Sequence, residues 1–249
     1  MEKLKDRDIC VRVEGLHKSY GDQSVLENVD MMLKEGEIHG ILGRNGAGKT
    51  TLIECLVGLR SYETGHVELF GETDIHFVRQ KVGIQPQEAN LFPRQTAEEI
   101  LQLFSSFYEK PMELRTLIEL LEMQPLLKKK VKDLSVGQRQ RLLVSLALVG
   151  DPDLVILDEP TSGLDPQVRR LIWECLLEMK SKRKTILLST HYMEEAEKIC
   201  DTIFILHDKH IVAEGSPQEV VRKHRKKFND RLEGVFVHLT GKALRGGLD

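Results

Sequence analysis

The alternation of apolar and polar residues divides the chain into three regions. From Val11 to about Leu33, and again at 67–70, short alternating segments such as VRVEG and NVDMML predict twisted antiparallel strands. Between residues 88 and 150 the apolar spacing lengthens to that of helices. From Leu154 onward, the apolar runs LVIL, TILLS and TIFIL alternate with helical stretches, which predicts a parallel α/β core.

Two helices are predicted early in the middle region. Thr96, followed three residues later by Glu99, has the capping-box pattern of a helix start. The apolar face expected for this helix consists of Ile100, Leu103, Phe104 and Phe107. Proline is favoured at the first position of a helix, so we expect Pro111 to open the second one. The apolar stripe of that second helix consists of Leu114, Leu117, Ile118 and Leu121.

Candidate chemistry first appears at 43–50, where GRNGAGKT follows the apolar stretch 38–42. This is the pattern G-x-x-x-x-G-K-[ST] between a strand and a helix, the context in which it binds phosphate. Its glycines lack a Cβ, so the backbone N–H groups can approach phosphate oxygens closely. Lys49 is expected to reach the β- and γ-phosphates, and Thr50 to hold Mg²⁺. The chain is therefore predicted to bind a nucleoside triphosphate.

A second candidate motif is LVILDEP at 154–160. The four apolar residues predict a strand buried on both faces of a parallel sheet. Asp158 then lies at the carboxyl end of the strand, where ligands bind in open α/β sheets, and can hold Mg²⁺. Glu159 is placed to orient and deprotonate the attacking water. Standing alone, the same residues would be a strand that ends in an acidic turn.

A third motif, LSVGQRQR at 134–141, precedes an apolar stretch that Gly150 and Pro152 close. Ser135 is expected to be the N-cap of a helix whose first N–H groups are free to bind an anion. The chain then holds two anion-binding helix starts. They serve either two ligands or one ligand shared between two protomers.

Together these motifs resemble those of the ATP-binding cassette (ABC) ATPases, over roughly residues 11–215. GRNGAGKT resembles Walker A, LVILDEP resembles Walker B with its catalytic glutamate, and LSVGQ is similar to the LSGGQ signature. Further positions that match family motifs are Gln87 of the Q-loop, Asp165 of the D-loop (SGLD), His191 of the switch and Tyr20, the adenine-stacking aromatic. Without the resemblance, Tyr20 would be an exposed turn aromatic, Gln87 a polar loop residue and Asp165 a turn former.

The resemblance implies a complete set of site residues. The catalytic residues are Glu159, His191 and Gln87, and the Mg²⁺ ligands are Thr50, Gln87 and Asp158. The residues that bind the nucleotide are Tyr20, Gly43, Arg44, Asn45, Gly46, Ala47, Gly48, Lys49, Thr50 and Thr51. The signature residues Ser135, Val136, Gly137 and Gln138 act on the nucleotide of a second protomer.

One residue departs from the family pattern. Val136 stands where the family signature has glycine. A β-branched side chain stiffens the helix start and reduces close approach of a partner. This leaves open a cassette that binds ATP as a regulatory module with low turnover.

The resemblance implies an α/β fold: a P-loop NTPase core of ABC type with a mixed, mainly parallel sheet. An antiparallel β subdomain lies at the N-terminus, and a helical subdomain (about 88–150) is inserted into the core. We expect residues 1–220 to form one ATPase domain and 221–249 a basic helix and tail. The segment 232–245 resembles the tail of ATPase subunits from bacterial drug-resistance exporters.

Composition agrees with an ATPase that acts inside the cell. The 249 residues are 41% hydrophobic and 30% charged, as in ordinary globular domains. The net charge of −3 argues against a general nucleic-acid surface. The four cysteines show no C-x-x-C spacing and are expected to be reduced thiols. The N-terminus lacks a signal-peptide core, and no apolar run approaches the ~20 residues that span a bilayer.

The predicted mechanism is ATP hydrolysis across a head-to-tail dimer of two ATPase subunits, with ATP and Mg²⁺ as ligands. The family implies that dimer closure drives a separate transmembrane permease, docked near Gln87. The chain would then be cytoplasmic and peripheral on the inner face of the membrane. Among the alternatives, a translation-type ABC protein needs two cassettes and a DNA-repair ABC ATPase needs a long heptad insertion, and both are absent from this sequence.

Overall fold

The computed structural model describes residues 9–87, 89–224 and 231–241, and contains two sheets. The first is antiparallel, with the order β2-β1-β4. Its strands are β1 (Ile9–Tyr20), β2 (Gln23–Lys34) and β4 (Thr64–Leu69). Burial alternates along β1 at Val11 and Val13 and again at Leu16 and Lys18, and a shift in register lies between the two pairs.

The second sheet has the strand order β5-β6-β7-β3-β8-β9. All neighbouring pairs are parallel except β8 and β9, which are antiparallel. The strands are β3 (Ile38–Leu42), β5 (Val82–Gln85), β6 (Leu154–Asp158), β7 (Thr185–Thr190), β8 (Thr202–His207) and β9 (His210–Gly215). Every residue of β3, β6 and β7 is buried, as expected for parallel strands covered on both faces. The predicted mixed, mainly parallel sheet and the antiparallel subdomain are confirmed.

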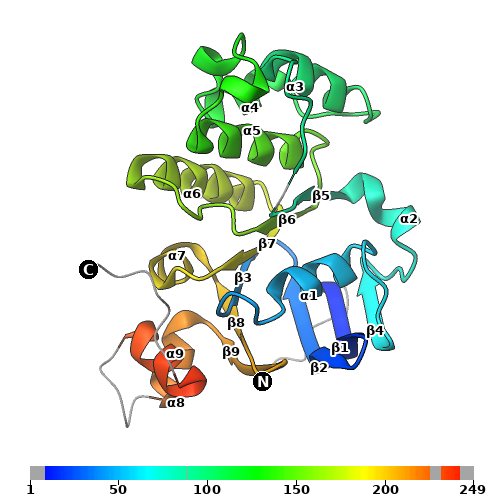
Figure 1. Cartoon of the computed structure of the whole chain (residues 1–249), viewed down its shortest axis with the longest axis vertical. Coiled ribbons are helices and arrows are strands. Elements are labelled where there is room, and N and C mark those ends of the chain that lie inside the picture. The colour runs from blue at the N-terminus through cyan, green and yellow to red at the C-terminus, as the bar shows by residue number, and fades with distance from the viewer. Residues whose placement is uncertain (1–8, 88, 225–230, 242–249) are drawn as a thin grey trace.

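Different elements cover the two faces of the mainly parallel sheet (Figure 1). On one face, α1 (Lys49–Leu56) packs between this sheet and the antiparallel one, in a core that includes Leu52, Ile156 and Phe204. On the other face, a second core joins α6 (Pro166–Ser181), α7 (Met193–Ile199), α8 (Pro217–His224) and α9 (Leu232–Thr240) to the sheet. Figure 1 shows α8 and α9 together beside β9.

The inserted helical part contains α3 (Ala97–Ser105), α4 (Leu114–Leu120) and α5 (Val136–Leu148). These helices lie together at one end of the molecule, above α6 in Figure 1. The chain also forms several short helices, which are α2 (Ile75–Val78), η2 (Arg79–Lys81), η3 (Gln124–Leu126) and η4 (Val131–Asp133). Strand β5 meets α5 very closely, because a Cβ added at Gly83 would lie 1.8 Å from the Ala147 carbonyl oxygen. Only glycine permits that approach.

Two details of the predicted helices are wrong. Pro111 does not open a helix, since α4 begins at Leu114 after the N-cap Glu113. The segment before α4 is instead held to the end of α5, because Met112 N donates to Val149 O at 2.8 Å. Phe107 lies beyond the end of α3 and is 61% exposed, and Leu103 is 38% exposed. The buried face of α3 comprises Ala97, Ile100 and Leu101.

The C-terminal prediction is only partly open to comparison. The basic helix predicted to start at residue 221 overlaps α8 as far as His224, and the segment 232–245 overlaps α9 and Gly241. The remaining residues of both segments lie outside the described residues. Within α9, the apolar side chains Leu232, Val235 and Phe236 are buried in the same core as α6 and α7.

Candidate functional site

The loop at 43–50 connects β3 to α1 and adopts glycine-dependent conformations. Gly46 (φ +80°) and Gly48 (φ +103°) lie in the left-handed region, where a Cβ is strained. Gly43 has no room for a side chain, because an added Cβ would lie 2.9 Å from Leu206 O. Helix α1 begins directly after Gly48, so its first N–H groups open toward the loop. The loop therefore has the backbone geometry that a phosphate-binding turn requires.

Lys49 is buried beneath this loop. Its Nζ atom donates to the carbonyl oxygens of Gly43 (3.0 Å) and Arg44 (3.2 Å). The same ammonium lies 3.1 Å from Oε1 of Glu159, and the two side chains are only 5% and 10% exposed. The cation expected to meet the triphosphate is thus paired with the carboxylate expected to act as the base.

Oxygen atoms from three elements meet at Thr50. Its hydroxyl donates to Oδ2 of Asp158 at 2.6 Å and lies 3.4 Å from Oε1 of Gln87. Hard oxygen donors are the ligands that Mg²⁺ prefers, and it commonly takes only one or two from protein together with phosphate and water. The structure brings together the three predicted Mg²⁺ ligands. No group of three or more His, Cys, Asp or Glu side chains suited to a metal occurs in the described part of the chain.

Asp158 and Glu159 are both oriented by Ser189, a buried residue of β7 that sequence reasoning missed. The Ser189 hydroxyl donates to Oδ1 of Asp158 and accepts from the backbone N–H of Glu159 at 2.9 Å. Glu159 has φ +50°, a left-handed conformation that is costly for a residue with a side chain. The sequence signal that could have identified Ser189 is its position as a polar residue at the end of the apolar run TILLS.

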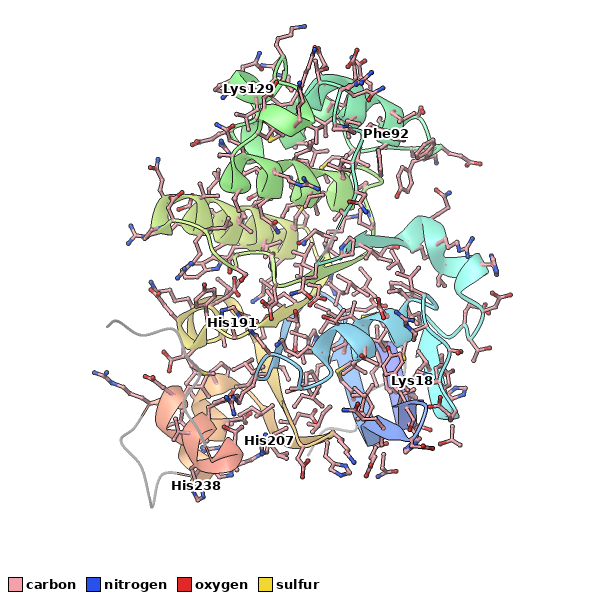
Figure 2. The ribbon with its side chains drawn as sticks, viewed as in Figure 1. Lys18, Phe92, Lys129, His191, His207 and His238 are labelled. Carbon is pink, nitrogen blue, oxygen red and sulfur yellow. The ribbon has the colours of Figure 1, made fainter. Side chains whose placement is uncertain are left out.

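Lys49 and His191 flank the Glu159 carboxylate on its two sides. Oε2 lies 3.2 Å from Nδ1 of His191, which follows β7, while Oε1 faces Lys49. Figure 2 shows His191 near the middle of the molecule, beside α7. The contact with His191, followed by the charge of Lys49, lowers the pKa of Glu159 to about 2, against desolvation that acts in the opposite direction.

The signature residues lie at the start of α5 and have the local structure that the sequence predicts. Ser135 Oγ accepts from Gln138 N at 3.3 Å, and Gln138 Oε1 accepts from Ser135 N at 3.2 Å, which completes a capping box. Val136 is 70% exposed. Among the described residues, no hydrogen bond or ion pair joins 135–138 to residues 43–51 of the same chain. Ser135 is exposed as well.

The remaining predicted residues lie at the ends of elements. Tyr20 ends β1, is 43% exposed, and has the cations of Lys18 and Arg60 at 5.3 and 5.5 Å from its ring centroid. Asp165 is the N-cap of α6 and accepts from Gln167 N and Val168 N, each at 3.0 Å. Arg139 of α5 donates to the carbonyl of Ala89, which ties the signature helix to the segment that follows Gln87.

Comparisons with known proteins agree with this arrangement. A family model described as "ABC transporter" matches residues 26–162. The chain is 41% identical over 217 residues to a Nod factor export ATP-binding protein I of Ralstonia nicotianae, covering 84% of this chain and 68% of that one. A solved structure of the ATP-binding subunit of an ABC transporter has a TM-score of 0.83 and 30% identity, with 92% and 99% of the two chains covered. A dimeric post-hydrolysis cassette bound to ADP and Pi has a TM-score of 0.73 and 28% identity, with 83% and 98% covered.

The fold and the site are those of an ATP-binding cassette, and the chain belongs to the ABC transporter family. It is an ATPase that serves as the ATP-binding subunit of an ABC transporter. In the parts of the chain that the structure describes, no helix is both long and apolar enough to cross a membrane.

Proposed function

We propose that this chain hydrolyses ATP in a head-to-tail dimer and couples dimer closure to a separate membrane permease of an exporter. The observation that carries the proposal is the position of the Glu159 carboxylate. It lies between Lys49 of the phosphate-binding loop and His191. Glu159 also directly follows Asp158, which accepts a hydrogen bond from Thr50. A base, a phosphate-binding cation and a metal-ligand set therefore converge on one point at the carboxyl end of the sheet.

Within one protomer, each group has a distinct task. Residues 43–51 bind the phosphates through backbone N–H groups, and the Lys49 ammonium neutralises the β/γ-phosphates. Tyr20 offers its exposed ring to the adenine. When bound by Thr50, Gln87 and Asp158, Mg²⁺ supplies charge neutralisation at the phosphate oxygens. Glu159 accepts a proton from the attacking water, and His191 contacts the γ-phosphate.

The second protomer supplies the start of α5. The capped but exposed helix start at Ser135 and Gly137 suits the γ-phosphate bound by the opposite chain. ATP then stabilises the closed dimer because its γ-phosphate touches both chains, and hydrolysis removes that differential contact. The dimeric cassette with ADP and Pi noted above supports the pairing of two cassettes.

Coupling to a permease is proposed through the surface beside Gln87. Gln87 is exposed, and Phe92 in the segment that follows is 54% exposed. Figure 2 shows Phe92 on the helical part, on the side that faces α2. An exposed aromatic ring next to a nucleotide-contacting loop suits a partner that senses the nucleotide state. An export direction is proposed because the relative described above bears the name of an export protein. The chain would then lie at the cytoplasmic face of the membrane.

Val136 supports a second candidate function, an ATP-binding regulatory cassette with low turnover. Its side chain projects into solvent at the point where two protomers would meet, 70% exposed. A β-branched residue there reduces close approach of the opposite phosphate-binding loop. Intact Glu159 and His191 favour turnover.

The deciding experiment compares wild type with Glu159→Gln. The amide keeps the shape of the side chain but cannot accept a proton, so hydrolysis should fall by roughly 10²–10⁴-fold. ATP affinity by calorimetry should not fall, and sedimentation in Mg²⁺ and ATP should show a stable dimer. Glu119→Gln, on the exposed face of α4, is the matched control and should behave as wild type.

Each alternative gives a different result. Equal hydrolysis by wild type and Glu159→Gln would refute the catalytic assignment. The same mass in every nucleotide state would refute the nucleotide-driven dimer. Tight ATP binding by wild type without turnover would favour the regulatory cassette.

A further inference from the structure

The residue after the proposed switch histidine lies between two functional segments. Tyr192 is the N-cap residue of α7, and its ring centroid is 4.2 Å from that of His191, at an interplanar angle of 37°. Side chains of neighbouring residues in extended backbone usually point to opposite sides. Here the two rings contact each other, so a displacement of the Tyr192 ring displaces His191.

The other end of Tyr192 reaches the D-loop (162–165). Its hydroxyl accepts from the backbone N–H of Gly163 at 3.4 Å. Gly163 has φ +69° and nothing within 4 Å of an added Cβ, so the loop is open on its other side. The D-loop immediately precedes α6, where Asp165 caps the helix.

Arg169 of α6 closes the contact from the opposite side. Its guanidinium carbon lies 4.3 Å from the centroid of the Tyr192 ring, within the range of a cation–π interaction. The same guanidinium donates to Leu164 O at 3.4 Å. The D-loop and the Tyr192 ring are therefore held by one side chain.

A second, buried connection keeps the helices around this cluster in place. Glu195 of α7 is fully buried, and its Oε1 atom accepts from Thr161 Oγ1 (2.8 Å) and Trp173 Nε1 (2.7 Å). Thr161 lies two residues after Glu159, and Trp173 lies on α6. Helices α6 and α7 thus move with the loop that follows the proposed base, and Tyr192 is the contact within this unit that reaches His191.

We propose that Tyr192 is a positioning residue that transmits the placement of the D-loop to His191. This proposal rests on the proposed function, in which the D-loop lies at the contact between protomers and His191 acts on the γ-phosphate. Docking of a partner protomer against 162–165 shifts Gly163 and Leu164, and the Tyr192 ring carries that shift to the imidazole. Turnover then requires a correctly seated partner, while nucleotide binding by the single chain does not.

The test separates turnover from binding in two variants. Tyr192→Phe keeps the ring between His191 and Arg169 but removes the acceptor for Gly163 N, and should lower kcat about threefold to tenfold, the worth of one hydrogen bond. Tyr192→Ala also removes the ring contacts and should lower kcat by a further factor of about ten. ATP affinity should stay within about twofold of wild type in both variants, because no hydrogen bond or ring contact joins Tyr192 to the described residues 43–51, which are proposed to bind most of the triphosphate.

The matched control is Tyr108→Phe, in the segment that follows α3. Tyr108 is half-buried, and its hydroxyl has no hydrogen-bond partner among the residues that the structure describes. This control should keep the wild-type kcat. Emission from Trp173, the single tryptophan of the chain, should be unchanged in Tyr192→Phe without nucleotide, which verifies that α6 and α7 are intact.

A double-mutant cycle tests whether the D-loop is the source of the effect. Asp165→Ala removes the oxygen that accepts from Gln167 N and Val168 N at the cap of α6, and should add little to the loss caused by Tyr192→Phe if the two act along one route. Multiplicative losses in the double variant would overturn the proposal, as would a wild-type kcat in Tyr192→Ala or a parallel loss of ATP affinity. If Glu159→Gln abolishes turnover while both Tyr192 variants keep it, this inference fails and the proposed function stands. A wild type without turnover overturns both.

Discussion

The ammonium of Lys49 and the carboxylate of Glu159 form an ion pair, with 3.1 Å between Nζ and Oε1. Neither group is fully available for its proposed task while they remain paired. In the proposed function, triphosphate oxygens would compete with Glu159 for the ammonium, so nucleotide binding would remove the Lys49 contact and leave the His191 contact in place. A base whose pKa is about 2 holds protons poorly, and release of Lys49 moves the pKa upward toward the range of a useful base. Occupancy of the site and strength of the base are linked through this pair.

Competition for Lys49 predicts tighter ADP binding by Glu159→Gln. The amide pairs with the ammonium more weakly than the carboxylate does, so less interaction is lost when phosphate takes its place. We expect about a fivefold gain in ADP affinity, or roughly 1 kcal/mol, by calorimetry without Mg²⁺. ADP separates this effect from simple repulsion of a γ-phosphate by Glu159. An ADP affinity equal to that of wild type would show that the ion pair does not oppose binding.

The same pair predicts a pH-dependent stability of the nucleotide-free protein. The pKa of Glu159 is lower in the folded chain, about 2, than its ordinary value of 4.5. Its stabilising contribution is therefore fully present above pH 4.5 and is lost as the pH falls toward 2. The free energy of unfolding, measured in urea, should be about 1–3 kcal/mol higher for wild type than for Glu159→Gln at pH 7. This difference should narrow below pH 4.5. Lys49→Ala should reduce the gap only in part, because His191 still faces the carboxylate. A gap that does not change with pH would contradict the assignment.

Tyr20 is expected to contribute to nucleotide affinity by stacking on the adenine. Its ring is exposed at the end of β1, with Lys18 and Arg60 near its centroid. Tyr20→Ala should weaken ATP and ADP equally, by roughly 1–2 kcal/mol, the range for a base stacked on an aromatic ring. Tyr20→Phe retains the ring and serves as the control. A loss confined to ATP would mean that Tyr20 senses the γ-phosphate rather than the adenine.

Val136 stands where the family signature has glycine, and substituting it tests the effect of that difference. Because its side chain is 70% exposed, Val136→Gly removes no core contact. Glycine restores the family residue and eases approach of the opposite chain, so ATPase activity should be equal or higher. Stability should fall by no more than about 1 kcal/mol, the helix penalty of glycine. A large drop in turnover with an intact fold would reveal a contact made by Val136 across the dimer.

Much of the fold was predictable because its determinants are local. The strand alternation of β1, the capping boxes at Thr96 and Ser135, and the glycine-rich loop each depend on a few neighbouring residues. The start of α4 was not predictable in this way. Pro111 has the right residue type for a helix opening, but Met112 donates its backbone N–H to Val149 O, and α4 begins only at Leu114. That bond comes from a residue 37 positions away.

The candidate site shows the same division. The family resemblance implied Thr50, Gln87 and Asp158 as one ligand set, and the structure brings their oxygen atoms together at the carboxyl end of the sheet. Pairing of Lys49 with Glu159, and the orientation of both acidic residues by Ser189, depend on how β6 and β7 lie side by side. Tyr192 was passed over because an aromatic residue before a helix has no distinctive sequence pattern. Its partners Gly163 and Arg169 come from the previous loop and helix.

The close approach of Gly83 to Ala147 has a mechanical consequence. Near its last turn, α5 packs closely against the edge strand β5, so a rotation of the helical part about that contact would move the start of α5 the most. The 13 residues of α5 span about 20 Å, and Ser135 stands at the opposite end of this lever. A rotation of about 10° at the clamp would carry the signature roughly 3 Å. Arg139, near the moving end, would draw the carbonyl of Ala89 with it. A small rotation at Gly83 would thereby become a larger displacement at the helix start that we propose contacts the opposite protomer's nucleotide.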